Sequence, residues 1–173
     1  FISIARTAGS AGNLVVTGAG TRLNLDNNIG DTSVSGLSIG RGSTGTMTIS
    51  SGAIVRVDDR GAAAFAEIKI GGNQGTVPAD RLIGSGTLTI TGAGSRLDMI
   101  GVEASIDVGR FGTASRGTLN VLDGASLHTT SMRIGLGDKA IGTDGATGAV
   151  VVDNASVVLD GVDTAGQGAF LAL

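Results

Sequence analysis

The chain has 173 residues, of which 41% are hydrophobic, so it is long and apolar enough to form one folded domain rather than a disordered segment. It contains no cysteine, which excludes disulfides, thiolate metal sites and cysteine nucleophiles. Its 12 Lys and Arg residues are scattered among 15 Asp and Glu residues, and no apolar run reaches about 18 residues, so we expect neither nucleic-acid binding nor membrane insertion by this segment.

The residue types predict short strands joined by tight turns. Glycine occurs 31 times, and four Phe are the only aromatic residues. The apolar bulk therefore comes from Val, Ile, Leu and Ala, accompanied by many Ser and Thr. This mixture is typical of stacked strands separated by Gly turns, because β-branched residues favour strands and glycine favours turns.

Three types of short strand recur in a fixed order. The first type is expected at FISIA (1–5), LSIG (37–40), IKIG (68–71), IDVG (106–109), MRIG (132–135) and FLAL (170–173). The second type is expected at GNLVV (12–16), GTMTI (45–49), GTLTI (86–90), GTLNV (117–121) and GAVVV (148–152). The third type follows after a short turn, at RLNL (22–25), IVRV (54–57), RLDM (96–99), SLHT (126–129) and SVVL (156–159).

Apolar residues alternate within each strand, which gives every strand one face for a core. In the second type the expected inward residues are Leu14, Val16, Met47, Ile49, Leu88, Ile90, Leu119, Val121, Val150 and Val152. In the first type the equivalent positions are Ile2, Leu37, Ile68, Ile106, Met132 and Leu171, at intervals of 26 to 39 residues. Three short strands cannot bury their inward side chains alone, so neighbouring repeats must stack.

The repeat predicts an all-β fold, a right-handed parallel β-helix of about five coils with three short strands each. A propeller blade would need four antiparallel strands, whereas each strand type occurs once per repeat here. We expect residues 1–173 to form a single β-helix segment. Since the chain starts at Phe1 without Met and ends in mid-pattern, we expect it to be a fragment of a longer repeat-containing protein.

The turns between the second and third strands are glycine-rich. They read TGAGTR, SSGAI, TGAGSR, LDGAS and DNAS. We expect Gly or Asn there to adopt left-handed backbone angles, because every coil must turn the same corner.

Two stretches, IDVGRFGTASRGTLNVLDGASL (106–127) and GTLTITGAGSRLDM (86–99), show the whole pattern of strand, Gly, spacer, strand, turn and strand. This pattern, which covers essentially the entire chain, resembles the passenger repeat of autotransporter (type V secretion) proteins and related bacterial exoproteins. The resemblance implies export from a Gram-negative bacterium, a β-helical stalk, and adhesion or surface display. It supplies no catalytic residue.

One outward row of charged residues allows two interpretations. By alternation, the middle residues of three first-type strands, Lys69, Asp107 and Arg133, form an outward charge ladder. In an enzymatic interpretation Asp107 is a base or metal ligand and Arg133 stabilises a developing anion. In a structural interpretation the ladder sets the strand register, at about 0.2–1 kcal/mol per pair. Arg56 beside Asp98 would form a second ladder of this kind.

Other features argue against an enzyme. The chain has no Trp or Tyr to form a sugar-binding platform, and His128, with Ser126 on the same face, lies in no nucleophile motif. The acidic stretches DNNIGD (26–31) and GDKAIGTDG (137–145) lack the calcium-binding nonapeptide pattern and are typical of turns. We therefore expect no catalytic residue, no metal and no cofactor.

If a ligand site exists, we expect it on the two long loops between first-type and second-type strands, at 72–86 and 136–148, because solenoid insertions gather on a binding face. The candidate ligand-binding residues are Asn73, Gln74, Asp80, Arg81, Asp138, Lys139 and Asp144. Surface insertions without a ligand are the alternative explanation of these loops.

The expected function is that of a structural stalk or adhesin passenger at the cell surface, associated with the outer membrane or secreted. Its partner would be a host-cell or matrix protein or a glycan. Two alternatives stay open. A carbohydrate-active β-helix enzyme, such as a polysaccharide lyase or hydrolase, would show a cleft with several carboxylates from adjacent coils. A self-associating biofilm scaffold would show a flat complementary side face.

Overall fold

The computed structural model describes residues 1–27, 35–59, 66–72, 83–101, 103–110, 114–135, 145–160 and 170–172. Within these residues the chain contains strands and no helix, and the strands form three parallel sheets. Sheet A contains β1 (Ile2–Ile4), β4 (Ser35–Ile39), β7 (Ala66–Ile70), β10 (Ser105–Val108), β13 (Ser131–Ile134) and β16 (Phe170–Ala172). Sheet B contains β2 (Ala11–Thr17), β5 (Thr44–Ser50), β8 (Ser85–Thr91), β11 (Arg116–Leu122) and β14 (Thr147–Asp153). Sheet C contains β3 (Arg22–Asn27), β6 (Ile54–Asp59), β9 (Arg96–Ile100), β12 (Ser126–Thr129) and β15 (Ser156–Leu159).

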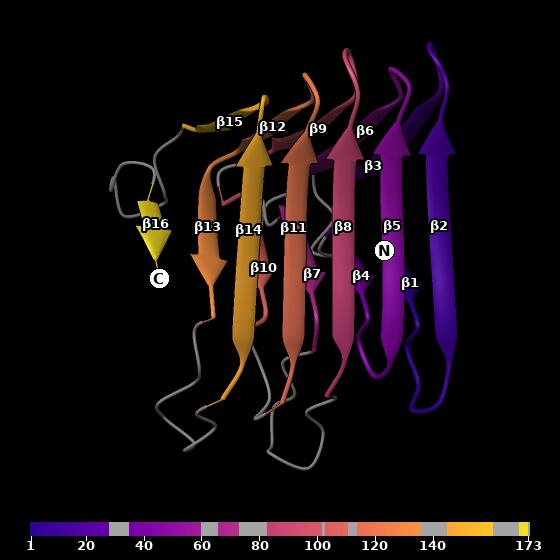
Figure 1. Cartoon of the computed structure of the whole chain (residues 1–173), viewed down its shortest axis with the longest axis vertical. Coiled ribbons are helices and arrows are strands. Elements are labelled where there is room, and N and C mark those ends of the chain that lie inside the picture. Colours follow the sequence, from indigo (N-terminus) through magenta and orange to yellow (C-terminus); the bar gives the residue numbers. More distant parts are fainter. Residues whose placement is uncertain are drawn as a thin grey trace.

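Each coil takes one strand from each sheet. The chain runs up a strand of sheet B, passes to the rear through sheet C, and descends through sheet A before it rises in the next strand of sheet B (Figure 1). The path advances steadily from β2 to β14 and turns in the right-handed sense, as crossovers between parallel strands do. The predicted all-β parallel β-helix is therefore confirmed.

The strand register agrees with the predicted equivalences. In sheet A, Ile2 pairs with Leu37, Leu37 with Ile68, Ile68 with Ile106, Ile106 with Met132, and Met132 with Leu171. In sheet B, Leu14 aligns with Met47, Leu88, Leu119 and Val150. Since side chains alternate between faces along a strand, this register places every inward residue above its equivalent in the preceding coil.

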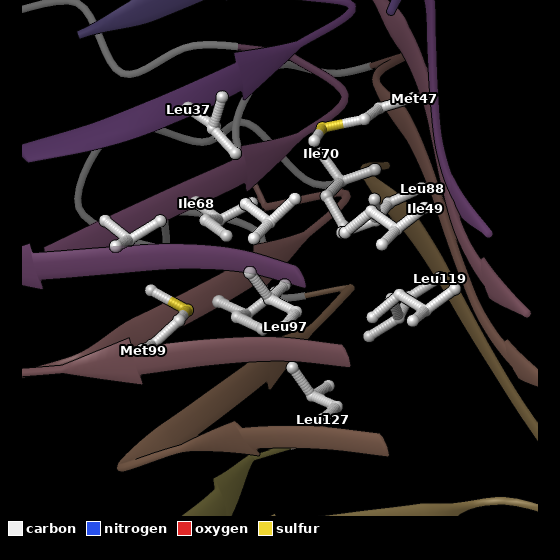
Figure 2. Close-up of a cluster of buried hydrophobic side chains, with 14 of the residues drawn as sticks. Leu37, Met47, Ile49, Ile68, Ile70, Leu88, Leu97, Met99, Leu119 and Leu127 are labelled. Carbon is white, nitrogen blue, oxygen red and sulfur yellow. The ribbon is translucent and has the colours of Figure 1, made fainter. Parts of the chain in front are cut away.

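The apolar core is a stack of these inward side chains. Figure 2 shows Leu37 and Ile68 of sheet A, Ile49 and Leu88 of sheet B, and Leu97 of sheet C pointing into the space between the sheets. All five are completely buried. At about 1.5–3 kcal/mol for a fully buried aliphatic side chain, the stack is the main stabilising contribution.

The last coil is less well covered than the coils before it. Val152 has the same inward position as Val121, yet 48% of its surface is exposed while Val121 is fully buried. The expected burial of Val152 is therefore wrong. The physical reason is its place on β14, which pairs with β11 on one side and is the last strand of sheet B among the described residues.

The corners between sheets B and C follow the predicted glycine rule and go beyond it. Each has a Gly or Asn with positive φ, namely Gly18, Gly52, Gly92, Gly124 and Asn154, and Ser51 and Asp123 adopt φ of 56° and 55° as well. At these two corners the chain accepts the steric cost of a Cβ in the left-handed region.

The corner between sheets A and B depends more strictly on glycine. Gly71 has φ of 78°, and a Cβ placed there would lie 2.1 Å from the carbonyl oxygen of Arg116 in the next coil. A Cβ at Gly117 would lie 2.3 Å from the carbonyl oxygen of Ile70. Backbones of successive coils therefore approach too closely here for any side chain.

We predict that Gly71→Ala destabilises the fold far more than Gly9→Ala. Gly9 has almost the same φ, 76°, but a Cβ there meets nothing within 4 Å, so both substitutions carry the strain of a left-handed alanine and only Gly71→Ala adds a clash with backbone. The expected difference in the free energy of unfolding is about 2 kcal/mol or more, measured by denaturant titration. Equal losses would contradict the close approach of the coils.

Candidate functional site

The outward row of sheet A is the most polar feature that the fold assembles from different coils. The register aligns Ser3, Ser38, Lys69, Asp107 and Arg133 on consecutive strands, on the face opposite the core. The charged residues expected to be neighbours thus stand side by side, although they come from positions 69 to 133 of the chain.

Asp107 lies at the centre of a compact ionic cluster. Its Oδ1 accepts a hydrogen bond from Arg133 Nε at 2.5 Å, and its Oδ2 accepts one from Arg110 Nη1 at 3.0 Å. Arg133 Nη2 also donates to Ser105 Oγ at 3.0 Å. The Asp107 side chain is only 1% exposed, which differs from the solvent-facing position that strand alternation suggests.

Lys69 does not join this cluster. Its Nζ lies 2.7 Å from Glu67 Oε2 on the same strand, although its register partner on β10 is Asp107. The row therefore divides into two charge groups, Glu67 with Lys69 and the Asp107 cluster with its two arginines. Both oxygens of Asp107 are occupied by guanidinium donors, so the geometry favours a structural role over that of a base or a metal ligand.

Sheet C shows the same preference for pairs along a strand. Arg56 and Asp98 are register neighbours, as expected, but Arg56 forms its ion pair with Asp58, and Asp98 forms its own with Arg96 at 2.9 Å. The hydrogen bond that Arg56 donates to the Asp58 carboxylate raises the pKa of Arg56. These pairs are partly exposed, so each contributes little to stability.

His128 lies at the outer face of sheet C next to Asp98. Its Nε2 contacts the carboxylate of Asp160, and both side chains are largely exposed, at 42% and 63%. No hydrogen bond joins Ser126 to His128 among the interactions of the described residues, so this arrangement does not resemble an activated nucleophile.

The outer face of sheet B is a regular array of small polar side chains. Thr46 donates to Asn13 Oδ1 at 2.8 Å, and Asn120 Nδ2 donates to Thr89 Oγ1 at 3.3 Å, each across neighbouring strands. The exposed Val15 and Val151 interrupt the array at its two ends. Hydrogen bonds between coils thus link several of the polar side chains on this face.

The long loops that are candidates for ligand binding cannot be placed in this description. All of the named residues lie outside the described ranges: Asn73, Gln74, Asp80, Arg81, Asp138, Lys139 and Asp144. Both loops leave from a strand of sheet A, β7 or β13, and return to a strand of sheet B, β8 or β14. They thus belong to the same corner of the coil.

In the described part of the chain no group of three or more His, Asp or Glu side chains is arranged to hold a metal ion. None of the described segments forms a helix with the length and hydropathy required to cross a bilayer.

Arg110 is the residue of the cluster that sequence reasoning missed. Strand alternation identifies only residues within a strand, and Arg110 lies just beyond β10, after the turn at Gly109. A signal was present, because the tetrapeptides SIGR (38–41) and DVGR (107–110) both place an arginine directly after the glycine that ends a sheet A strand.

Comparison of the chain with protein-family models, with curated proteins and with solved structures gives no match.

We predict that Asp107→Asn destabilises the protein by about 2 to 4 kcal/mol, because it leaves two partly buried guanidinium groups without their shared carboxylate. Asp98→Asn is the matched control. Asp98 and Arg96 are 23% and 47% exposed, so the loss there should stay below about 1 kcal/mol. Thermal and denaturant unfolding of both variants measure the difference, and losses of similar size would contradict the structural role of the Asp107 cluster.

Proposed function

We propose that the chain is a rod segment of an exported bacterial surface protein, a stalk or adhesin passenger of the autotransporter type from a Gram-negative bacterium. The observation that supports the proposal best is the unbroken register of strands through successive coils in all three sheets. At about 4.8 Å per coil, five coils extend roughly 24 Å along the axis. A longer array of the same repeat would hold an attached group away from the cell.

The stiffness of such a rod comes from hydrogen bonds that run along its axis. Each strand of sheet B pairs with its equivalents over seven residues, from Ser85 to Thr91 in β8 for example. Bending the rod would break these backbone bonds and open the stack of aliphatic side chains beneath them. The rod can therefore transmit force without a disulfide, which fits a chain that has no cysteine.

The same architecture suits folding after export. Each coil makes its hydrogen bonds with the adjacent coil, so a folded coil is a template for the one that follows it. Contacts form between residues about one coil apart, such as Met47 and Leu88, and no strand must wait for a distant part of the chain. A chain that emerges gradually at the cell surface can fold progressively in this way.

An enzymatic function receives less support from the described residues. A glycoside hydrolase needs two carboxylates that reach the substrate. The best placed carboxylate of sheet A, Asp107, is buried between two arginines, and Glu67 is paired with Lys69. The contact between Asp107 and Arg133 joins β10 to β13, which is what a rod requires.

The proposal predicts that the segment is exposed on intact cells. Antibodies raised against the purified chain should label unpermeabilised cells of the native host, and external protease should remove the label while leaving a cytoplasmic marker intact. Deleting the gene should abolish the label and reduce attachment to host cells or matrix. Labelling that appears only after permeabilisation would overturn the proposed location, and unchanged attachment would limit the proposal to a stalk.

A further inference from the structure

If coils are counted by their sheet A strands, the second coil begins with β4 and the fourth with β10. The fourth coil shows how an arginine is accommodated at the corner after sheet A. The chain leaves β10, turns at Gly109 with φ of 61°, and the next residue, Arg110, directs its guanidinium back to Asp107. Asp107, three residues earlier, is 1% exposed and accepts the hydrogen bond at 3.0 Å. At this corner the positive charge is balanced by a carboxylate on the preceding strand.

The second coil repeats the same backbone corner. Ser38 and Asp107 are equivalent, because both are register partners of Lys69 from opposite sides of β7. Gly40, with φ of 70°, occupies the position of Gly109, and Arg41 follows it as Arg110 follows Gly109. The arginine is thus retained in the second coil, while a serine replaces the carboxylate.

Polar atoms at this corner are buried and unsatisfied. Ser38 is completely buried, and its Oγ has no hydrogen-bond partner among the described residues. The Nε of Arg41 and the Oγ of Ser3, which is the register neighbour of Ser38, are also buried and have no partner in the described part of the chain. Buried donors are nearly always hydrogen-bonded in proteins. Ser3 and Ser38 are register neighbours, and Arg41 follows Ser38 at the spacing by which Arg110 reaches Asp107, so the three donors are placed to share one acceptor.

The surrounding charges define what kind of acceptor fits. Arg41 carries a positive charge, and the nearest charged residues along the row, Lys69 and Glu67, neutralise each other at 2.7 Å. The corner is therefore positive overall. A guanidinium N–H and two serine hydroxyls can all donate to an anion, whereas a cation would find no charged acceptor in this set.

We propose that Ser3, Ser38 and Arg41 form a binding site for a carboxylate group, which we name the coil 2 corner. The carboxylate of the ligand takes the place that the Asp107 side chain fills in the fourth coil. Arg41 donates from its guanidinium, and the serine hydroxyls donate to the remaining lone pairs. This site differs from the long loops expected to bind ligands, and it does not depend on the display of the rod.

Thermal unfolding with acetate as the probe tests this site. Four proteins are unfolded in sodium acetate and in sodium chloride of equal ionic strength at neutral pH. They are the unsubstituted chain, the variants Ser38→Asp and Arg41→Gln, and the control variant Arg22→Gln. Arg22 is an exposed arginine on β3, so its loss should leave the site intact. Acetate also changes the stability of proteins through general effects on their surfaces. The test is therefore whether the shift in Tm caused by acetate differs among the four proteins.

The site predicts that acetate raises the Tm of the chain and of Arg22→Gln by about 2–4 °C in a saturable way. Arg41→Gln should lose this response. Ser38→Asp, which supplies the carboxylate from the protein itself, should be more stable than the chain in chloride and should not respond to acetate. An equal response in the chain, Arg41→Gln and Arg22→Gln, or none in the chain, would overturn the proposal. If Ser38→Asp does not fold, the comparison of Arg41→Gln with Arg22→Gln decides alone.

Discussion

The whole structure depends on one constraint, the in-register stacking of each coil on the coil before it. A single coil has three strands of three to seven residues and too little apolar surface to fold alone. Stacking solves two problems together, because it pairs the backbone groups of every inner strand on both sides and aligns the inward side chains into a dry column. Val121 and Val152 show the effect within one row: the first is buried between two coils, and the second is half exposed in the last.

Stacking also explains where the sequence tolerates variation. At the corner between sheets A and B the coils approach so closely that residues such as Gly71 and Gly86 can carry no side chain. At the corner between sheets B and C there is more room, and Ser51 or Asp123 can replace glycine. The outward rows tolerate the widest range of residue types. One row of sheet A carries serine, lysine, aspartate and arginine in successive coils. The residues that differ in chemistry from one coil to the next are therefore found in the outward rows and in the loop sequences.

Much of the fold could be predicted from the sequence because its signal is local and repeated. Alternation identified the inward residues, and matching motifs such as GTLTI and GTLNV aligned the coils without any knowledge of their contacts. Partners of charged side chains could not be predicted in the same way. Register places Lys69 beside Asp107, but the flexible side chain of lysine reaches Glu67 instead, and Arg110 reaches Asp107 from beyond the strand. Such choices depend on side-chain reach and burial, which strand periodicity does not encode.

The most direct test of register stacking is to remove one coil and measure whether the rest still folds. Gly45 and Gly86 are register partners, so deletion of residues 46–86 joins Gly45 to Thr87 and keeps every later strand in phase. Deletion of 46–87 joins Gly45 to Leu88 and turns the apolar face of that strand outward. Circular dichroism and thermal unfolding should show a cooperatively folded, shorter β protein for the first deletion and loss of cooperative folding for the second. Two deletions of equal stability, or failure of the first alone, would contradict the stacked-coil account.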